Sequence, residues 1–357
     1  MAANCTRAST TYSFKAPPPD GESKPINIAI VGDLGIRKTS ATHTIKALID
    51  ARNKTDLYLR VGDISYADDH FVEHDPETYK QEWNDFQNAM QPITTTKFYM
   101  TEPGNHEVTC IQGHDKKRCA NPEHQPFRNF SAYLHPFRMP GDETGGFKNL
   151  WYSFTFGMVH IAVVTSETDF KGAPAGPNTT LNGGNFRPLG NQTQWLINDL
   201  DRTNKSRATV PWLVVAAHRP FFGSIPEAAN DIADQKIYNT CRQAFAAIME
   251  KYNVDFYFCG HVHWYERLLA ANSTGYPFAR NYIYQPGTIY VTSGAGGAPE
   301  PKQHIEKEAP AHAEYKSHYG YVNLEIKNAN YSQLTFIETL DLVRKKTLDV
   351  VDIYRKH

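Results

Sequence analysis

The sequence predicts an α/β protein built as a four-layer α-β-β-α sandwich, in which two packed mixed sheets are flanked by helices. Two observations predict this class: apolar strand-like runs alternate with amphipathic stretches up to residue 261, and a strand-rich segment closes the chain. Alternating strands and helices give a sheet covered by helices, and consecutive strands extend it. The 357 residues are 40% hydrophobic, which is enough for a sizeable core.

Each strand is predicted from a short apolar run bounded by turn residues. In chain order these runs are INIAIVGD, which ends at Asp33, LYLRVGD (57–63), KFYMTEPGN (97–105), WYSFTF with HIAVVT (151–165), WLVVAAH (212–218) and VDFYFCGH (254–261). The pair within 151–165 is typical of a hairpin. Four more runs, TIYVTSG, YVNLEI, LTFIET and LDVVDIY, close the chain as strands joined by short turns.

The helices are predicted from apolar residues at helical spacing over 40–51, 76–91, 192–203 and 240–252. The second is the clearest, because Tyr79, Trp83, Phe86 and Met90 form a stripe that would pack into a core. Residues 1–25 are polar and rich in proline, which favours a linker or a tail. We expect one domain over residues 26–357.

Composition argues against two classes of protein. Lys and Arg total 37 and Asp and Glu total 38, for a net charge of −1, whereas a dedicated nucleic-acid binder normally carries a basic excess. No apolar run approaches the ~20 residues that a membrane helix needs. We therefore expect no nucleic-acid partner and no membrane-spanning segment.

Eight Asn-x-Ser/Thr sequons, more than this composition gives by chance, predict a glycoprotein that is secreted or delivered to a vacuolar or extracellular space. They lie at Asn4, Asn53, Asn129, Asn178, Asn191, Asn204, Asn272 and Asn330. The first residues lack the features of a signal peptide. Either the signal lies upstream of this sequence, or the sequons are unused.

The five cysteines are an odd number, so they cannot all pair within one chain. Cys110 and Cys119 flank the polar stretch IQGHDKKR, a loop that a disulfide between them would close; two free thiols are the alternative. Cys259 lies inside an apolar run and is expected to be a buried free thiol. The pattern leaves Cys5 and Cys241 undecided.

Five predicted strand ends share one property: each stops on a side chain that can bind a metal. They are Gly32-Asp33, Gly62-Asp63 with Tyr66, Gly104-Asn105-His106, Ala217-His218 and Gly260-His261-Val262-His263. In α/β sheets, ligands bind beyond the carboxyl ends of the strands, so these ends are expected to converge. A glycine before the ligand lets the backbone turn and is expected to leave room for substrate. One Gly-Asp pair is usually a plain turn, but five such ends in order argue against coincidence.

Together the strand ends offer two carboxylates, one phenol, one amide and three imidazoles. Seven ligands oversupply one metal ion, whereas two ions that share a bridging aspartate receive four each. Two ions ~3.5–4 Å apart are the usual device for in-line attack at phosphorus. The sequence therefore predicts a binuclear centre that acts on phosphate esters.

The order of these motifs resembles the metallophosphoesterase superfamily over about residues 26–357. Within it, GDISYADD and GHVHWYER are similar to the purple acid phosphatases of fungi and plants. The resemblance implies an acid phosphatase that hydrolyses phosphate monoesters by attack of a metal-bound hydroxide. It also implies the ligands: for Fe(III), Asp33, Tyr66 and His263; for a divalent Zn, Mn or Fe, Asn105, His218 and His261; and, bridging both ions, Asp63.

His106 matches a histidine of the family that contacts the phosphate without binding metal, and it would stabilise the transition state or protonate the leaving group. A purely structural hydrogen bond is the alternative. Plant and animal members carry further histidines in the loop after the His218 motif, but this chain has none there. The general acid therefore stays open between His106, Glu227 and a metal-bound water.

Plant members of the family also carry an N-terminal β-sandwich, and in this chain only YSFKAPPPDG, within residues 1–25, resembles its last strand and linker. We interpret residues 1–25 as a linker or the tail of a missing upstream β-sandwich, and 26–357 as a metallophosphoesterase catalytic domain. Two other functions stay open: a metal-dependent phosphodiesterase or nucleotide pyrophosphatase, and a non-catalytic secreted metal-binding protein. The sequence leaves the natural substrate, the divalent metal, the pH optimum and the oligomeric state undetermined.

Overall fold

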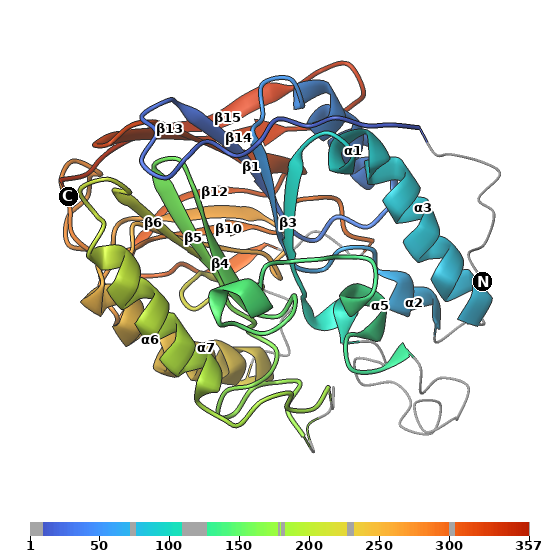
Figure 1. The fold of residues 1–357 in the computed structure, drawn as a ribbon, viewed down its shortest axis with the longest axis horizontal. Helices are drawn as coiled ribbons and strands as arrows, with labels where there is room; N and C mark the ends of the chain where they lie inside the picture. Colours follow the sequence, from blue (N-terminus) through green and yellow to red (C-terminus); the bar gives the residue numbers. More distant parts are fainter. Residues whose placement is uncertain are drawn as a thin grey trace, which may run out of the picture.

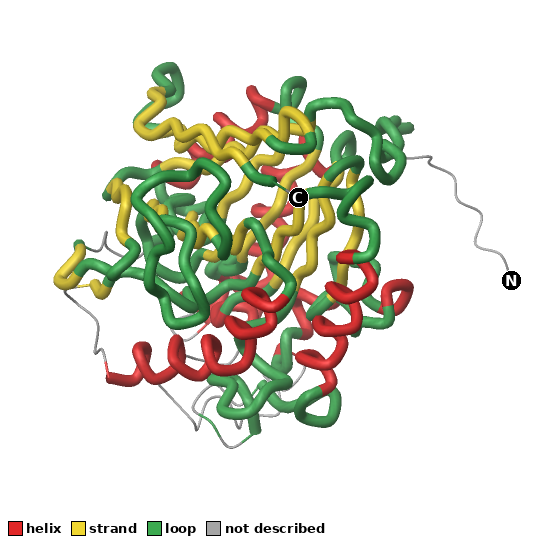
Figure 2. Tube along the Cα trace, turned by 90° about the vertical axis from the view of Figure 1, so that its left-hand side faces the viewer, coloured by secondary structure: helices red, strands yellow, loops and turns green. Residues whose placement is uncertain are grey.

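The structure is a computed structural model that describes residues 10–71, 76–108, 127–177, 179, 183–226, 232–299 and 304–356. Two mixed sheets pack face to face and helices cover their outer faces, so the predicted four-layer α/β sandwich is confirmed (Figure 1). Figure 2 shows the strands side by side through the middle of the molecule with the long helices outside them. No helix in the described ranges is long and apolar enough to span a bilayer.

The first sheet has six strands in the order β15-β14-β13-β1-β2-β3. Three successive parallel strands, β1 to β3, form one half, and three antiparallel strands from the end of the chain form the other. The bounds are β1 Ile26–Val31, β2 Leu57–Val61, β3 Phe98–Glu102, β13 Gly320–Asn328, β14 Tyr331–Glu338 and β15 Lys346–Tyr354.

The second sheet has seven strands in the order β12-β9-β10-β8-β6-β5-β4. Its centre is parallel from β5 to β10, and the hairpin of β4 and β5 forms one edge, as predicted. The bounds are β4 Tyr152–Phe156, β5 Val159–Val163, β6 Trp212–Ala216, β8 Phe256–Cys259, β9 Tyr265–Leu268, β10 Ile289–Ser293 and β12 His312–Lys316. A small separate pair consists of β7 Ile225–Pro226 and β11 Ile305–Lys307.

The helices lie over the two outer faces. The first sheet is covered by α1 and α3, and the second by α6 and α7 (Figure 1). The bounds are α1 Thr39–Ala51, α2 Ala67–Phe71, α3 Pro76–Thr94, α5 Ser131–Leu134, α6 Asn191–Asn204 and α7 Ile232–Lys251, with 3₁₀ turns η1 Asn105–Glu107 and η3 Asp142–Thr144. The stripe of Tyr79, Trp83, Phe86 and Met90 on α3 is buried in the core, as predicted.

Strand alternation divides the core into layers. On β1, Ile28 and Ile30 face the space between the sheets, whereas Ala29 and Val31 face the helices. The strands β2, β5 and β6 repeat this pattern, because successive side chains of a strand point to opposite faces. Both faces of these strands are therefore mostly apolar, which is why their sequences appear as nearly continuous apolar runs.

Three differences from the sequence prediction have physical causes. Helix α7 begins at Ile232, eight residues before the predicted start, because the apolar spacing is weak in its first two turns. Strand β9 was missed because it carries Glu266 and Arg267, which are buried as partners of other polar groups: Arg267 Nε donates to Asp349 Oδ2 at 2.8 Å. Strand β12 was missed because its side chains are mostly polar.

The segment before the first strand lies against the domain. The ring of Phe14 meets the ring of Phe98 edge-on, with centroids 5.6 Å apart, and the Gly21 N–H donates to the Gly157 carbonyl at 2.8 Å. The described part of this segment therefore packs on the first sheet and on the turn between β4 and β5.

Candidate metal centre

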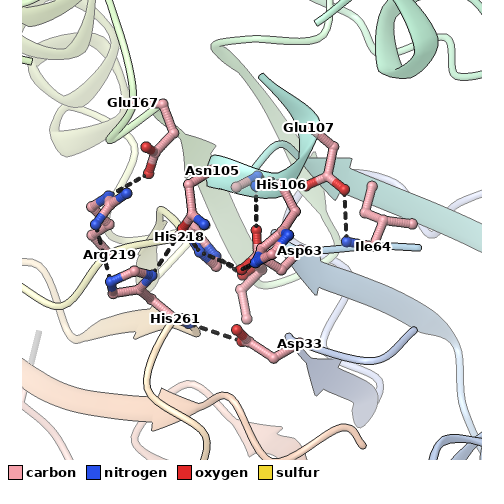
Figure 3. Close-up of polar contacts among 12 residues, drawn as sticks. Asp33, Asp63, Ile64, Asn105, His106, Glu107, Glu167, His218, Arg219 and His261 are labelled. Carbon is pink, nitrogen blue, oxygen red and sulfur yellow. Dashed lines mark hydrogen bonds and ion pairs between the residues drawn. The ribbon is translucent and has the colours of Figure 1, made fainter. Parts of the chain in front are cut away.

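Five strand ends from the two sheets meet at one place (Figure 3). In the first sheet, β1, β2 and β3 lead into Asp33, Asp63 and Asn105. In the second sheet, β6 and β8 lead into His218 and His261, and His263 follows two residues later. Tyr66 follows Asp63 by three residues, so all seven predicted ligands stand shortly after the carboxyl ends of strands, as expected for a binding site of an α/β protein.

The first of two donor groups, which we call the Tyr66 group, consists of Asp33, Tyr66 and His263. The Tyr66 hydroxyl lies 3.2 Å from Asp33 Oδ1 and 3.2 Å from His263 Nε2, and His263 Nε2 lies 3.4 Å from Asp33 Oδ1. All three side chains are buried. Carboxylate, phenol and imidazole atoms thus face one point in the interior.

The second donor group, which we call the His218 group, consists of Asp63, Asn105, His218 and His261. His218 Nε2 lies 3.1 Å from both Asp63 Oδ2 and Asn105 Oδ1, and His261 Nδ1 lies 2.9 Å from the same Asn105 oxygen. The donor atoms of Asp63, His218 and His261 all lie within 4.8 Å of one another. The two groups are linked because the His261 backbone N–H donates to Asp33 Oδ2 at 2.8 Å.

The spacing of these donor atoms fits metal ions. Adjacent ligands of an octahedral ion with bonds of ~2.1 Å are ~3 Å apart, and the contacts within both groups are 2.9–3.4 Å. The chemistry fits as well, since the Tyr66 group is richer in oxygen and the His218 group holds two imidazoles.

Charge also marks the centre. Burial alone would raise the pKa of Asp63, but the neighbouring His218 and His106 hold it well below its ordinary value. Burial, Arg219 and His218 lower the pKa of His261 well below that of a free histidine, so its imidazole stays neutral and able to bind a cation.

Four of the seven side chains stand on strained backbone. Asp33, Asp63, Tyr66 and His261 have φ of 53°, 43°, 58° and 69°, in the left-handed region that few residues other than glycine adopt. Such a conformation costs roughly 1–3 kcal/mol for each residue, and it is concentrated at functional sites. Asp33, Asp63 and His261 each come two residues after the end of their strand, and Tyr66 follows Asp63 by three residues.

Two of the glycines before the ligands, Gly62 and Gly260, make room for other ligands. A Cβ on Gly62 would lie 2.3 Å from His218 Nδ1, and Gly62 also has a φ of +78°. A Cβ on Gly260 would lie 2.3 Å from Asp33 Oδ2. Each glycine therefore lets a ligand from a different strand come close.

His106 lies beside the donor groups and belongs to neither. Its backbone N–H donates to Asp63 Oδ1 at 3.0 Å, its Nδ1 lies 2.9 Å from Asp68 Oδ1, and its Nε2 lies 3.9 Å from Asp63 Oδ2. Burial opposes protonation, but Asp68 and Asp63 raise the pKa of His106 well above its ordinary value. The imidazole is thus anchored through Nδ1, and Nε2 is directed toward the ligands.

Sequence reasoning missed Asp68, which lies on α2 behind His106, although it is part of the quoted GDISYADD motif. It also missed Glu107, which holds two ligand-bearing turns together: its carboxylate accepts the backbone N–H of Ile64 at 2.8 Å and that of Gly104 at 2.8 Å. Burial and Asp63 raise the pKa of Glu107 to about 7.

A third missed feature is the pair of Arg219 and Glu167 on the other side of the centre (Figure 3). Arg219 Nε donates to Glu167 Oε1 at 2.8 Å, and its Nη1 lies 3.0 Å from His261 Nε2. Both side chains are buried. The pair therefore fixes the ring of His261 with Nδ1 toward Asn105. The HRP stretch that contains Arg219 was the available signal.

Cys241 and Cys259 are both buried free thiols, which confirms the prediction for Cys259. The predicted disulfide of Cys110 and Cys119, the candidate acid Glu227 and the sequons at Asn4 and Asn178 lie outside the described residues. Of the other sequon asparagines, Asn272 is half-buried and the rest are exposed, namely Asn53, Asn129, Asn191, Asn204 and Asn330.

The fold and the order of the site residues define the metallophosphoesterase class. A family model described as calcineurin-like phosphoesterase matches residues 26–265, and another, described as iron/zinc purple acid phosphatase-like protein C, matches residues 287–350. The chain belongs to the calcineurin-like phosphoesterase family, and its relatives include acid phosphatases of fungi and purple acid phosphatases of plants, which confirms the resemblance.

The chain is 30% identical to an acid phosphatase of Aspergillus ficuum, covering 76% of this chain and 58% of the relative. It is 25% identical to Fe(3+)-Zn(2+) purple acid phosphatase 12 of Arabidopsis thaliana, covering 93% of this chain and 64% of the relative. The chain therefore spans about three-fifths of both relatives. A purple acid phosphatase from yellow lupin (Lupinus luteus) seeds shares the fold, with a TM-score of 0.74 at 22% identity over 98% of this chain and 57% of that one.

Proposed function

We propose that this protein is a metal-dependent acid phosphatase that hydrolyses small phosphate monoesters. The observation that carries the proposal is the meeting of the Tyr66 group and the His218 group at the carboxyl ends of five strands, with Asp63 between His106 and His218. Two cations held there would polarise a phosphate ester and lower the pKa of a bound water, which is what hydrolysis of such an ester requires.

The Tyr66 group is the proposed site of Fe(III), because a phenol and a carboxylate are hard oxygen donors. The His218 group is the proposed site of a divalent Zn, Mn or Fe, and Asp63 is the proposed bridge. The name of the Arabidopsis relative, an Fe(3+)-Zn(2+) purple acid phosphatase, supports this pairing. Asp63 is suited to bridging because its carboxylate stays ionised beside His218.

His106 is the proposed group that touches the substrate. Asp68 holds Nδ1 and leaves Nε2 facing the ligand cluster, and Asp68 and Asp63 raise the pKa of the imidazole, which favours its protonated form. A protonated imidazole in this position would bind a phosphate oxygen or give its proton to the leaving alcohol. Arg219 and Glu167 serve the same centre by holding the ring of His261 in place.

Metal analysis together with a visible absorption spectrum tests the proposal. We expect about two metal ions per chain, at least one of them iron, and a tyrosinate-to-iron charge-transfer band. Tyr66→Phe should remove the colour and keep the fold, whereas Tyr58→Phe should keep the colour, because the Tyr58 hydroxyl donates to the Leu48 carbonyl away from the centre. A colourless, fully active wild type with two zinc ions would refute the iron assignment alone.

Turnover separates the candidate reactions. We expect the two-metal protein to hydrolyse phenyl phosphate at acid pH and to act far less on bis(4-nitrophenyl) phosphate. The opposite preference would favour a phosphodiesterase. A protein that binds both ions and hydrolyses neither ester would be a metal-binding protein, and the phosphatase proposal would fail.

We also propose that the protein is secreted or vacuolar and carries glycans. Five sequon asparagines are exposed on the described surface, where an oligosaccharide can be attached without unfolding the chain. Asn272 is the least suitable, because its Oδ1 accepts the backbone N–H groups of Thr274 and Tyr276.

A further inference from the structure

A cavity of about 300 Å³ lies between α7, the segment that follows Arg219, and the loop at 274–276. Four aromatic side chains line it: Phe221, Phe222, Tyr238 and Tyr276. A larger cavity of about 540 Å³ lies at the other end of β3, around Lys97 and Phe98, and touches none of the seven ligands. None of the seven ligands lines the smaller cavity either, so its relation to the centre depends on the residues that its lining contacts.

Two features place this cavity beside the His218 group. The ring of Tyr238, which lines the cavity, also meets the ring of His261 edge-on, with centroids 6.0 Å apart and planes at 85°. Phe221 and Phe222 follow directly after His218, Arg219 and Pro220 in the chain. The part of a bound ester that lies beyond its phosphate would thus have an aromatic hollow next to it.

The cavity wall presents flat surfaces. The guanidinium of Arg242 lies over the ring of Phe222, with its carbon 5.3 Å from the ring centroid, and a hydrogen bond to Asn239 holds it. Tyr238 and Arg242 are four residues apart on α7 and therefore share one face of the helix. Planar guanidinium groups and aromatic rings both stack on a planar ring, whereas they gain less from a flexible chain of the same size.

These walls are held in place by packing. Phe221 stacks on Tyr257, with centroids 4.1 Å apart, and Phe222 meets Tyr290 edge-on at 4.8 Å. Gly275 has a φ of +85°, and a Cβ there would lie 2.5 Å from the ring of Phe222, so only glycine lets the loop close on this side. A cavity formed in advance loses little entropy when a ligand enters it.

We propose that this cavity binds the leaving group of the substrate, and that the preferred leaving group carries a planar aromatic ring. This inference rests on the proposed phosphatase function and narrows its substrates to monoesters of aromatic alcohols. Phe222 and Arg242 supply the stacking surface, and Tyr238 connects that surface to the centre where the phosphate would sit.

The test compares 2-phenylethyl phosphate with hexyl phosphate, because both are esters of primary alcohols of similar reactivity and only one contains a ring. For the wild type we expect a higher kcat/KM on the phenylethyl ester. Arg242→Ala should reduce that preference about three- to tenfold, mainly through KM. Arg242→Lys should behave like Arg242→Ala, because it keeps the charge and loses the plane. Tyr276→Ala, at an exposed lining position, should also reduce the preference.

The matched control is Arg187→Ala, since Arg187 also lies over an aromatic ring, Phe147 at 4.6 Å, but outside the cavity. It should leave the preference unchanged. Equal kcat/KM for both esters in the wild type would overturn the inference and leave the phosphatase function intact. Full preference in both Arg242→Ala and Tyr276→Ala would also overturn it, because the ring would then be recognised outside this cavity.

Binding of unreactive analogues separates failure of this inference from failure of the proposed function. If the metal-loaded wild type hydrolyses neither ester, the phosphatase proposal falls, and calorimetry with 2-phenylethylphosphonate and hexylphosphonate still decides the cavity. Tighter binding of the phenylethyl compound, weakened by Arg242→Ala, would support the aromatic site. Equal binding would refute it.

Discussion

Replacement of Gly260 by alanine tests how tightly the two sheets are joined at the metal centre. A Cβ at this position would lie 2.3 Å from Asp33 Oδ2 and 2.7 Å from the Val61 carbonyl oxygen. Contacts below 3.0 Å are essentially never seen for a real Cβ, so the Asp33 carboxylate must retreat by at least 0.7 Å, the difference between 3.0 and 2.3 Å. Metal-ligand distances tolerate only ~0.2 Å.

We therefore expect Gly260→Ala to lose metal while keeping its fold. The added methyl group costs ~1–3 kcal/mol of overpacking, which a domain with the usual stability of ~5–15 kcal/mol survives. Displacement of the Asp33 carboxylate should weaken metal affinity by ~10–100-fold or more. This is the range seen when a group that hydrogen-bonds to a metal ligand is removed. The backbone of Gly260 is not in the left-handed region, so the effect is purely steric.

The assay is metal content after dialysis against a weak chelator, combined with a thermal melt. The control is Gly223→Ala, whose Cβ would lie 3.4 Å from Glu266 Oε2, an ordinary contact. It should retain both ions. If Gly260→Ala retained two ions and full activity, the close approach of Asp33 to the end of β8 would not matter, and the account of the glycines would be wrong.

Three other predictions concern the proton donor, pH and glycans. His106→Ala should keep both ions and lower kcat by ~10²–10⁴. Asp68→Asn should lower kcat ~10–100-fold, and in the double variant it should add nothing to the loss caused by His106→Ala. Additive losses in kcat would contradict the view that Asp68 acts through His106. Burial raises the pKa of Glu82 to about 7 despite its bond from Arg37, so the folded state holds a proton that the unfolded chain releases above about pH 4.5. The free energy of unfolding should therefore fall by up to ~3 kcal/mol as the pH rises from about 4.5 to 7, at ~1.4 kcal/mol per pH unit. Urea unfolding at pH 5 and pH 8 tests this: the free energy of unfolding should differ less between the two pH values for Glu82→Gln than for the wild type. Made in a eukaryotic secretory host with a signal supplied, the protein should lose several kilodaltons on enzymatic deglycosylation, and an unchanged mass would mean that the sequons are not used.

The sequence by itself determined the layers and the ligand types. The runs that became β1, β2, β5 and β6 are apolar at most positions, since both faces of these strands are buried. The ends of β1, β2 and β6 carry ligands, as do the ends of β3 and β8. The order of Asp33, Asp63, Asn105, His218 and His261 was readable because each follows its own strand locally. Local patterns of this kind depend only on neighbours in the chain.

Only the tertiary structure decided which ligands meet. The contact of the His261 backbone with Asp33 joins residues 228 apart, and it exists because β1 and β8 belong to different sheets that pack face to face. The same holds for polar groups whose role is to hold other side chains, such as Asp68 behind His106 and Arg219 behind His261. A charged residue in a loop or helix has no local signature of burial, because burial is tolerated only through partners that the fold brings to it.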